Sequence, residues 1–443
     1  MRICSVVTCC LALIAAGCGR PGRPPGPPVP KTQEISAKQA SVSGEAAALK
    51  VGDGDWPMWR GPNADGIATG PAVPTKWKET ENALWNVVWK VKLPGRGHSS
   101  PIIIGGRIFL ETADEQAKVQ SVVCLDRKDG KQLWQQPLFE GNFETQMHDQ
   151  STQASSTLAC DGERLYAMFL NDRKIWATAL DLDGKQVWQT EVGSFAAKFG
   201  YSASPTLYKS LVLLAADHQQ GGFIAALNRA DGAIVWRKPR PEYSSYASPR
   251  VVTLGGKDQL VICGCREVAS YDPLTGDQLW STPGTAEAGV GLPVTTGSLV
   301  IASGGFPQKE TIALKPDGTV AWRNANKSYV PSLLVLDGYL YVVSDDGIAR
   351  CHDAASGVEK WKHRVGGEFR VSPVASGGNI FTTDMSGKTT VFKANPEKYE
   401  QVAENRLGTE GFASPGISKG QLFLRVADSS KGPRQEWLYC IGI

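Results

Sequence analysis

A glycine followed four positions later by a tryptophan recurs six times between residues 130 and 361 and constrains the fold of this chain more than any other feature. The successive tryptophans are 54, 48, 44, 42 and 39 residues apart. Recurrence at such intervals indicates stacked copies of one supersecondary unit, and a unit of this length can hold the four short strands of a propeller blade. The pattern occupies Gly130–Trp134, Gly184–Trp188, Gly232–Trp236, Gly276–Trp280, Gly318–Trp322 and Gly357–Trp361.

A second marker, an apolar strand that usually opens with a proline after a serine, recurs in phase with the first. Each opening is followed by a hairpin with a turn such as Gly105-Gly106 or Asp337-Gly338. These residues tolerate the positive φ that tight turns require. Eight openings predict eight blades in an all-β chain. The openings are Pro101, Ser156-Thr157, Pro205, Pro249, Pro293, Pro331, Pro373 and Pro415.

The two ends of the chain each contain part of one blade. The unit that opens at Pro415 has two further strands, Gln421–Val426 and Glu436–Ile441, but no final tryptophan strand. The segment Leu84–Val91 contains Trp89 and fits the missing place. We therefore predict an eight-bladed β-propeller of four-stranded antiparallel blades, whose last blade is closed by the N-terminal strand. Closure removes the free sheet edges that invite aggregation.

We expect the recurring tryptophans to be structural. Neighbouring blades diverge outward, and a large flat side chain on an outer strand fills the wedge between them. The unit that opens at Pro373 has Val402 where a tryptophan is expected. The inter-blade role is assigned to Trp89, Trp134, Trp188, Trp236, Trp280, Trp322 and Trp361.

The first residues have the pattern of an export signal. Arg2 precedes the apolar stretch Ile3–Ala16, which is too short to span a bilayer. The small residues before Cys18 resemble a lipobox, so we expect Cys18 to carry a lipid anchor. The alternative is an ordinary secretory signal that is cut near Cys18.

This interpretation divides the chain into three parts. We expect residues 1–17 to be a lipoprotein signal peptide, residues 18–54 a disordered Pro/Gly/Ala-rich tether, and residues 55–443 the propeller. The protein would then be secreted across the inner membrane. It would lie in the periplasm or be anchored at the outer membrane.

Composition excludes several function classes. The chain has 47 Lys and Arg against 44 Asp and Glu, without long basic runs, which argues against a nucleic-acid partner. The His residues show no H-x-H or HExxH spacing, and the cysteines beyond Cys18 show no C-x-x-C spacing, so we expect no metal site. The disulfide state of these cysteines is left open. They are Cys124, Cys160, Cys263, Cys265, Cys351 and Cys440.

The repeat resembles a known family. Segments such as Cys124–Trp134 follow the pattern [A/C]-L-D-x-x-[T/D]-G-x-x-x-W, which resembles the PQQ-like repeat of bacterial quinoprotein alcohol dehydrogenases. Asp55–Asn63 resembles the start of many secreted proteins with this repeat. The same repeat forms BamB-type lipoproteins of outer-membrane β-barrel assembly. The resemblance covers residues 55–443 and implies an eight-bladed propeller, but it is weak for function, because propellers host unrelated activities.

Quinoprotein chemistry does not carry over from this resemblance. The dehydrogenases hold PQQ with Ca²⁺ and often have a disulfide between adjacent cysteines, whereas the adjacent pair here is Cys9-Cys10 in the signal. No Asp maps by motif onto the catalytic base. Oxidation on a quinone needs a preorganised metal and base, so we expect a scaffold without the cofactor and assign no catalytic residue.

One set of loops, from each tryptophan strand to the next opening, should meet at the mouth of the central channel. Nearly all of them contain an aromatic residue, His or Arg two to four positions before the opening, and such side chains commonly anchor ligands or partners. The alternative is that they plug the channel and pack between blades. The candidates are His98, Tyr201, Tyr246, Tyr329, Phe369, Arg370 and Phe412.

The longest of these loops, residues 139–156, accounts for the 54-residue interval. Glu144, His148 and Asp149 could do acid–base work there, and His148 and Asp149 join the candidate binding residues. No nucleophile motif accompanies them, so a solvated loop is favoured.

These features predict a monomeric, non-enzymatic envelope lipoprotein that binds or assembles proteins through its loops and channel mouth. Outer-membrane assembly components are candidate partners. Two alternatives stay open. One is a PQQ-dependent dehydrogenase with Ca²⁺, and the other is an extracytoplasmic sensor that binds a ligand or glycan.

Overall fold

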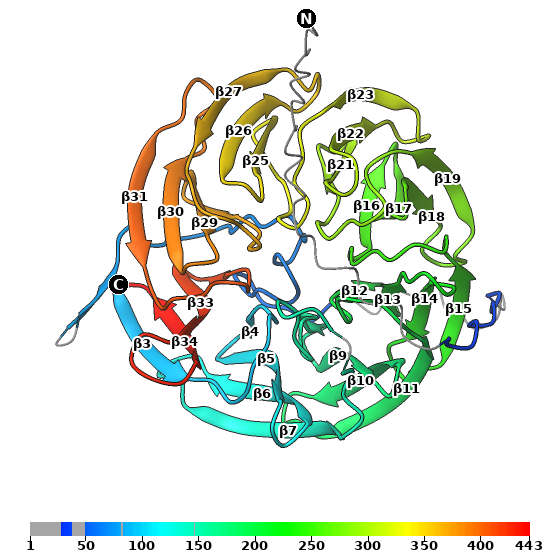
Figure 1. Cartoon of the computed structure of the whole chain (residues 1–443), viewed down its shortest axis with the longest axis horizontal. Helices are drawn as coiled ribbons and strands as arrows, with labels where there is room; N and C mark the ends of the chain where they lie inside the picture. The colour runs from blue at the N-terminus through cyan, green and yellow to red at the C-terminus, as the bar shows by residue number, and fades with distance from the viewer. Residues whose placement is uncertain (1–27, 38–48, 81–82, 146) are drawn as a thin grey trace, which may run out of the picture.

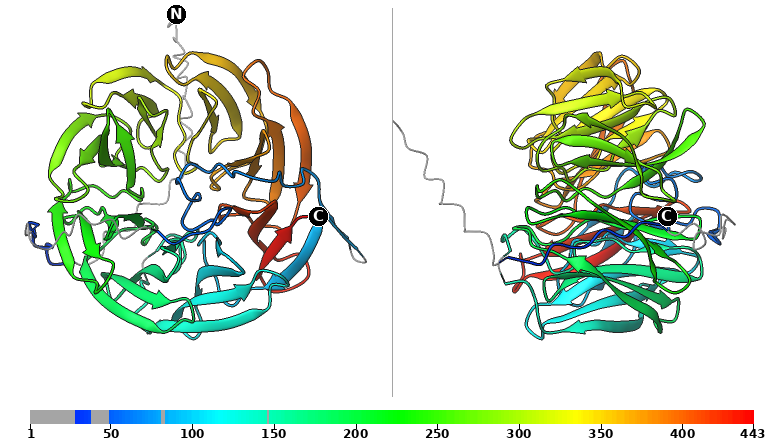
Figure 2. Two further views of the ribbon diagram at one scale, coloured as in Figure 1. Left: turned by 180° about the vertical axis from the view of Figure 1, so that it is seen from behind. Right: turned by 90° about the vertical axis from the view of Figure 1, so that its right-hand side faces the viewer.

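The computed structural model describes residues 28–37, 49–80, 83–145 and 147–443. The predicted signal peptide, residues 1–17, and Cys18 lie outside these residues. Within them the chain forms 34 strands and no helix, arranged as eight four-stranded sheets and one two-stranded sheet. The eight sheets surround a central axis as the blades of a propeller (Figure 1), and the side view in Figure 2 shows the ring on edge.

The blades are numbered in chain order, and the strands of each are given from the channel outward. Blade 1 is β4 (Ile102–Ile104), β5 (Arg107–Asp114), β6 (Val119–Asp126) and β7 (Gln132–Glu140); blade 2 is β8 (Ala159–Cys160), β9 (Arg164–Asn171), β10 (Lys174–Asp181) and β11 (Gln186–Ser194). Blade 3 is β12 (Thr206–Tyr208), β13 (Leu211–Ala216), β14 (Phe223–Asn228) and β15 (Ile234–Pro239); blade 4 is β16 (Arg250–Leu254), β17 (Lys257–Gly264), β18 (Glu267–Tyr271) and β19 (Gln278–Pro283).

The second half of the ring repeats this plan. Blade 5 is β20 (Val294–Thr295), β21 (Val300–Gly304), β22 (Glu310–Leu314) and β23 (Val320–Asn324); blade 6 is β24 (Leu334–Leu336), β25 (Tyr339–Val343), β26 (Ile348–Asp353) and β27 (Glu359–Arg364). Blade 7 is β28 (Val374–Ser376), β29 (Asn379–Thr383), β30 (Lys388–Lys393) and β31 (Gln401–Arg406); blade 8 is β32 (Gly416–Ser418), β33 (Gln421–Asp428), β34 (Gln435–Ile441) and β3 (Val87–Lys92).

Blade 8 joins the two ends of the described chain. Strand β3 pairs antiparallel with β34, with Val91 opposite Leu438. In Figure 1 the blue β3 lies beside the red β34 near the C-terminus. The predicted eight-bladed ring, closed by the N-terminal strand, is therefore confirmed.

The inner strands begin where the opening pattern predicts, with two exceptions. Proline directly precedes the inner strand in six blades. In blade 2 Leu158 takes its place, so the predicted opening Ser156-Thr157 lies one residue too early. In blade 6 the inner strand starts at Leu334, so Leu333 occupies the proline position and Pro331 lies two residues earlier. Pro331 was therefore wrongly aligned with the other openings.

The paired glycine and tryptophan of the repeat meet across the gaps between blades. A Cβ added to the glycine of six blades would lie 2.5–3.0 Å from the nearest ring atom of the preceding blade's tryptophan. A side chain there would displace the ring, which explains why the two residue types recur together. The pairs are Gly130 with Trp89, Gly184 with Trp134, Gly232 with Trp188, Gly276 with Trp236, Gly318 with Trp280, and Gly357 with Trp322.

The indole nitrogens also join neighbouring blades. The Nε1–H of each of the seven inter-blade tryptophans donates to a backbone carbonyl of the next blade, over 2.8–3.2 Å. Small residues lie opposite these tryptophans in the neighbouring strand, among them Cys124, Cys351 and Cys440. All six described cysteines are buried and unpaired.

Blade 7 lacks its own seam tryptophan and uses another. Ala403, not Val402, pairs with Val391 at the tryptophan position, because a β-bulge follows this pair as it does in the sister blades. The indole of Trp77, from the N-terminal segment, stacks on Phe381 in the same row of the sheet, with ring centroids 6.3 Å apart and planes 16° apart. Trp77 and Ala403 share one core cluster, so Trp77 fills space that Ala403 leaves.

The range that the sequence predicts as a disordered tether, residues 18–54, contains ordered stretches. Ile35 exchanges two backbone hydrogen bonds with Arg237 on the outer strand β15, and Ala37 packs beside that strand. The N–H of Lys50 donates to the carbonyl of Asp161 in blade 2. Residues 28–37 and 49–54 therefore lie against the ring. These residues differ from the predicted disordered tether because β15 offers a free sheet edge with which Ile35 can pair.

The described part of the chain contains no helix that could span a bilayer.

Candidate functional site

Eight equivalent loop positions form a ring at the mouth of the channel. Each lies three residues before the proline position, which is the residue that directly precedes the inner strand. We call these residues the mouth ring, and they are His98, Ser155, Ser202, Tyr246, Val290, Val330, Arg370 and Phe412. All eight line one cavity of about 300 Å³, which we call the cup.

A second ring, two residues further into each blade, consists mostly of hydroxyl side chains. We call it the hydroxyl girdle, and its members are Ser100, Thr157, Ser204, Ser248, Leu292, Ser332, Ser372 and Ser414. The backbone N–H of a member donates to the side-chain oxygen of the next, over 2.8–3.1 Å, from blade 1 to blade 4 and from blade 5 to blade 8. The series is interrupted between blades 4 and 5 because Leu292 has no hydroxyl.

The floor of the cup is formed by the N-terminal segment. Trp56 exchanges two backbone hydrogen bonds with Ile103, the carbonyl of Pro57 accepts from Cys160, and Ala68 donates to Ala375. These partners lie three residues beyond the girdle along the inner strands, so residues 55–68 close the channel below the girdle. The blue segment that crosses the centre of the ring in Figures 1 and 2 is this plug.

The buried side chain of Arg60 holds the plug. Arg60 is 1% exposed and donates to the carbonyls of Leu333 and Pro373 in blades 6 and 7, over 2.7 and 3.2 Å. Trp59, the preceding residue in the sequence, lines the cup. The cup is therefore blind, with one open end between the mouth loops.

The predicted candidates separate into two groups. His98, Tyr246, Arg370 and Phe412 belong to the mouth ring, while Tyr329 and His148 line the cup from neighbouring loop positions. Tyr201 and Phe369 are buried and do not line it. Asp149 does not line it either, and its carbonyl accepts from Arg96.

Sequence reasoning missed three contributors to the cup. Trp59 lies in the segment Asp55–Asn63, which drew notice only for its family resemblance. Phe199 lies two residues before Tyr201 in the same loop, contacts Tyr246 edge-on and points into the cup. The signal for the hydroxyl girdle is the serine that precedes most of the opening prolines, a recurrence that also marks the strand starts.

The mouth ring contains one histidine and one arginine, and neither adds a free positive charge to the cup at neutral pH. His98 stacks on Phe412 with centroids 4.5 Å apart. Burial, together with Arg96, Arg425 and Arg434, holds the pKa of His98 well below its usual 6.5, so the ring is uncharged at neutral pH. Arg370 faces Asp345, with Nη1 3.5 Å from Oδ1.

Asp345 also shapes the mouth. Its carboxylate accepts the backbone N–H groups of Tyr329 and Val330, over 2.6 and 3.0 Å. These bonds fix the sixth mouth loop, and they place Asp345 behind Arg370 rather than in the cup.

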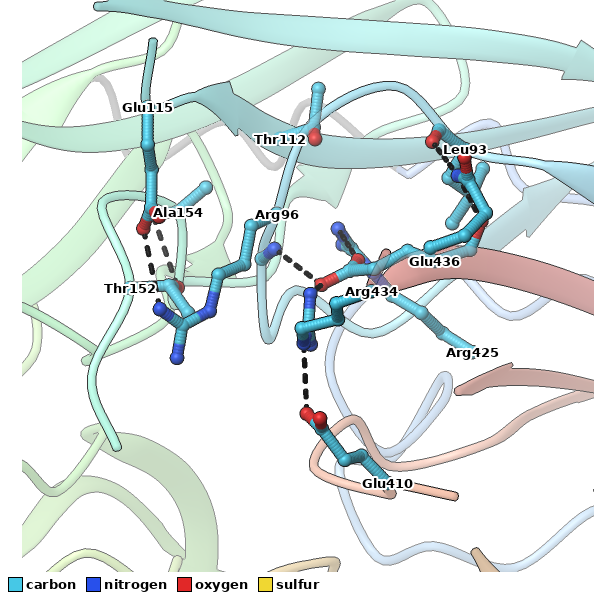
Figure 3. Close-up of polar contacts among 12 residues, drawn as sticks. Leu93, Arg96, Thr112, Glu115, Thr152, Ala154, Glu410, Arg425, Arg434 and Glu436 are labelled. Carbon is cyan, nitrogen blue, oxygen red and sulfur yellow. Dashed lines mark hydrogen bonds and ion pairs between the residues drawn. The ribbon is translucent and has the colours of Figure 1, made fainter. Parts of the chain in front are cut away.

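An ion-pair network secures the seam between blades 8 and 1 beside His98 (Figure 3). Arg425 and Glu436 are buried neighbours on β33 and β34, with Nε 2.6 Å from Oε2. The guanidinium also donates to two carbonyls of blade 1, and Glu436 accepts the N–H of Gly97 over 3.1 Å. Arg434 joins Glu436 to Glu410 over 3.0 and 2.8 Å. The network ties the last blade to the first mouth loop.

The lining does not suit a PQQ–Ca²⁺ pair. Calcium prefers several carboxylate or carbonyl oxygens, and the lining residues of the cup include no Asp, Glu or Cys. The described residues contain no group of three or more His, Cys, Asp or Glu side chains arranged to hold a metal ion. No catalytic step through PQQ is derived from this site.

Comparison with known proteins places the chain in a family. The family model described as outer membrane protein assembly factor BamB matches residues 84–195, 118–306 and 264–369. An outer membrane protein assembly factor BamB from Yersinia pestis is 25% identical over 302 residues, which cover 67% of this chain and 64% of that protein. The match thus spans less than two thirds of that relative's length.

Solved structures agree on the fold. BamB from Moraxella catarrhalis superimposes with a TM-score of 0.57 and 15% identity, covering 80% of this chain and 96% of that one. A europium-containing methanol dehydrogenase gives a TM-score of 0.67 and 12% identity, covering 89% and 99%. At such identities these likenesses show the propeller and not the activity. The family match, in contrast, extends over more than half of the sequence, and the chain belongs to the BamB-like family of PQQ-like β-propeller repeat proteins.

Proposed function

We propose that the protein is a monomeric, non-enzymatic scaffold of the cell envelope that binds components of outer-membrane protein assembly. The relatives named as assembly factors support this proposal. The cup supports it as well, since its lining contains no carboxylate or thiol that could hold a metal ion.

One surface carries the proposal. Beside blade 8, the two-stranded sheet of β1 (Lys78–Glu79) and β2 (Leu84–Trp85) leads directly into β3. Leu84, Trp85 and Val88 are 42%, 55% and 46% exposed. Adjacent exposed apolar side chains of this size mark an interaction site more often than isolated ones do. We call these three residues the hairpin surface.

The charges around the hairpin surface define the partner. Lys76, Lys78 and Lys92 are exposed beside it, while Glu79 is engaged by Tyr439 and Lys90. A matching partner has an apolar patch with an acidic rim, since opposite charges steer association and set its orientation. In Figure 1 this hairpin projects from the ring beside β3, where a neighbouring protein can reach it.

The envelope location is part of the same proposal. A signal in residues 1–17 would direct export, and a lipid on Cys18 would hold the ring at the periplasmic side of the outer membrane. Cys18→Ala should release the protein from the membrane fraction and abolish incorporation of labelled fatty acid. Membrane retention of an unlabelled Cys18→Ala variant would contradict the anchor.

The partner is tested by crosslinking in cells. A photoreactive amino acid at position 85 should crosslink to a component of outer-membrane protein assembly. The matched control is position 279, because Leu279 is 48% exposed on the outer strand β19 of another blade. Equal crosslinking from both positions, or none from position 85 in correctly localised protein, would contradict the proposed surface. One PQQ bound per chain, lost on chelation, would overturn the non-enzymatic assignment.

A further inference from the structure

We infer that the cup is a binding site for one uncharged saccharide unit. The inference goes beyond the scaffold role, because the cup and the hairpin surface are separate parts of the molecule. Three properties of the cup carry it: the hydroxyl donors of the girdle, the aromatic faces around them, and the near absence of net charge.

The girdle directs hydrogen-bond donors into the cup. Six of its members line the cavity, namely Ser100, Thr157, Ser204, Ser248, Ser372 and Ser414. Five of these side-chain oxygens accept a backbone N–H from the preceding girdle residue, and within the described residues none of the six hydroxyls donates. Because a hydroxyl has one proton to donate, these groups can serve an oxygen-rich ligand.

An unpartnered histidine nitrogen adds to this polar set. His98 Nε2 is buried without a hydrogen-bond partner among the described residues. Its ring is held by the stack on Phe412 and borders the cup. Buried polar atoms usually find partners, so an orphaned nitrogen at a cavity wall points to a ligand group or an ordered water at that place.

Aromatic faces surround the hydroxyls. Trp59, Phe199, Tyr246, Tyr329 and Phe412 all line the cup. A saccharide ring presents C–H groups on its faces and hydroxyls at its edge, so it needs apolar contacts and directed polar contacts together. A peptide strand is recognised differently, through open backbone donors and acceptors of a sheet edge, and a blind cup offers none.

Charge and size narrow the ligand class. Arg370 is the one cationic side chain in the lining, and Asp345 faces its guanidinium. The pKa of His98 lies too low for that ring to add positive charge at neutral pH. An anion would therefore meet little net attraction. A volume of about 300 Å³ matches a small ligand, at the lower end of the usual range for binding pockets.

The test uses the purified full-length protein and a panel of neutral sugars: glucose, galactose, N-acetylglucosamine, maltose and cellobiose. At least one should bind saturably with a Kd of millimolar or lower, measured by calorimetry. Saturation-transfer NMR should show contact with its ring C–H protons. Absence of saturable binding by every sugar would overturn the inference. So would tighter binding of a carboxylate-bearing probe, such as a tripeptide or PQQ, at the same site.

Two girdle serines give a matched pair of variants. Ser332 and Ser372 each accept one backbone N–H in the girdle, but only Ser372 lines the cup. Ser372→Ala should weaken sugar binding about five- to tenfold, whereas Ser332→Ala should leave Kd within about twofold. Equal losses in both variants would assign the effect to the girdle's structure and overturn the site. Phe412→Ala, with folding checked by circular dichroism, should reduce affinity further.

The sugar test and the crosslinking test fail separately. Sugar binding by a protein that shows no crosslink from position 85 would remove the assembly role and leave the cup. Crosslinking from position 85 without sugar binding would remove the sugar site in the cup and leave the assembly role.

Discussion

The seams between blades and the mouth ring are built from the same eight repeats, yet they differ in how far they vary. At the seams a tryptophan occupies seven of eight equivalent positions, and a glycine of the next repeat faces six of them. At the mouth, eight equivalent positions hold six residue types. The gap between neighbouring blades has the same wedge shape all round the ring, so the same glycine–tryptophan pair recurs in it. A ligand in the cup has no eightfold symmetry, so each mouth residue meets a different environment.

The largest effect that this comparison predicts is at a buried seam. Trp236 is fully buried, and its indole donates to the carbonyl of Pro273 over 3.2 Å. Trp236→Ala should lower the free energy of unfolding by about 3–5 kcal/mol, because it leaves a cavity between blades 3 and 4. Urea denaturation of the variant and the natural protein measures this difference in the free energy of unfolding. The sugar affinity of the folded variant should stay unchanged. A loss of sugar affinity together with the loss of stability would contradict the separate roles of seams and mouth.

The seventh seam tests whether Trp77 replaces the missing tryptophan. Trp77→Ala should cost about 3 kcal/mol of unfolding free energy, since its indole is buried against Phe381. In that background, Ala403→Trp should restore part of the loss by supplying the ring from β31. Additive destabilisation in the double variant would show that the two positions do not share one space.

The glycines test the seams more finely. Gly276 has φ +72° and faces Trp236, where a Cβ would lie 2.5 Å from the ring. Gly256 has a similar φ of +77° with no atom within 4 Å of such a Cβ. Both Ala variants bear the cost of the left-handed backbone, so the excess loss in Gly276→Ala, about 1–3 kcal/mol, reports the contact with tryptophan alone. Equal losses in thermal or urea unfolding would remove the steric explanation.

The smallest predicted effect concerns pH. The pKa of His98 is lowered in the folded protein, so the unfolded chain binds a proton more readily. The stability due to its neutral form is present above pH 6.5 and is lost as pH falls below that value, by up to about 1.4 kcal/mol per pH unit. His98→Gln should therefore lose less stability than the natural protein between pH 7 and pH 5.5. Parallel stability curves would show that His98 does not titrate this way.

The ring was predictable from sequence because the features that build it are local and repeated. The hydroxyl residue before the inner strand, the turn glycines and the tryptophan occupy fixed places in nearly every unit. Errors arose where one blade departs from the others. Blade 6 shifts its proline by two residues, and the bulge in blade 7 moves the tryptophan position from Val402 to Ala403.

The cup was predictable only in part. Loop spacing brought His98, Tyr246, Arg370 and Phe412 to the mouth, because equivalent positions in a closed ring must converge. The same spacing could not separate Tyr329, which faces the cavity, from Tyr201 and Phe369, which turn between blades. The plug was not predictable, because Arg60 donates hydrogen bonds to carbonyls about 270 and 310 residues away, which no repeat pattern specifies.

The closure of blade 8 has a consequence for how the molecule is made. Tyr439 donates a hydrogen bond to Glu79, which lies 360 residues earlier in the sequence. Trp89 can pair with strand β34 only after almost the whole chain has been made. Contacts so distant in sequence form slowly and late in folding. An interrupted chain can stack its early blades, but it leaves β3 with an unpaired edge and no ring. Completion of the circle thus distinguishes finished molecules from truncated ones, and the exposed edge leaves truncated chains open to aggregation.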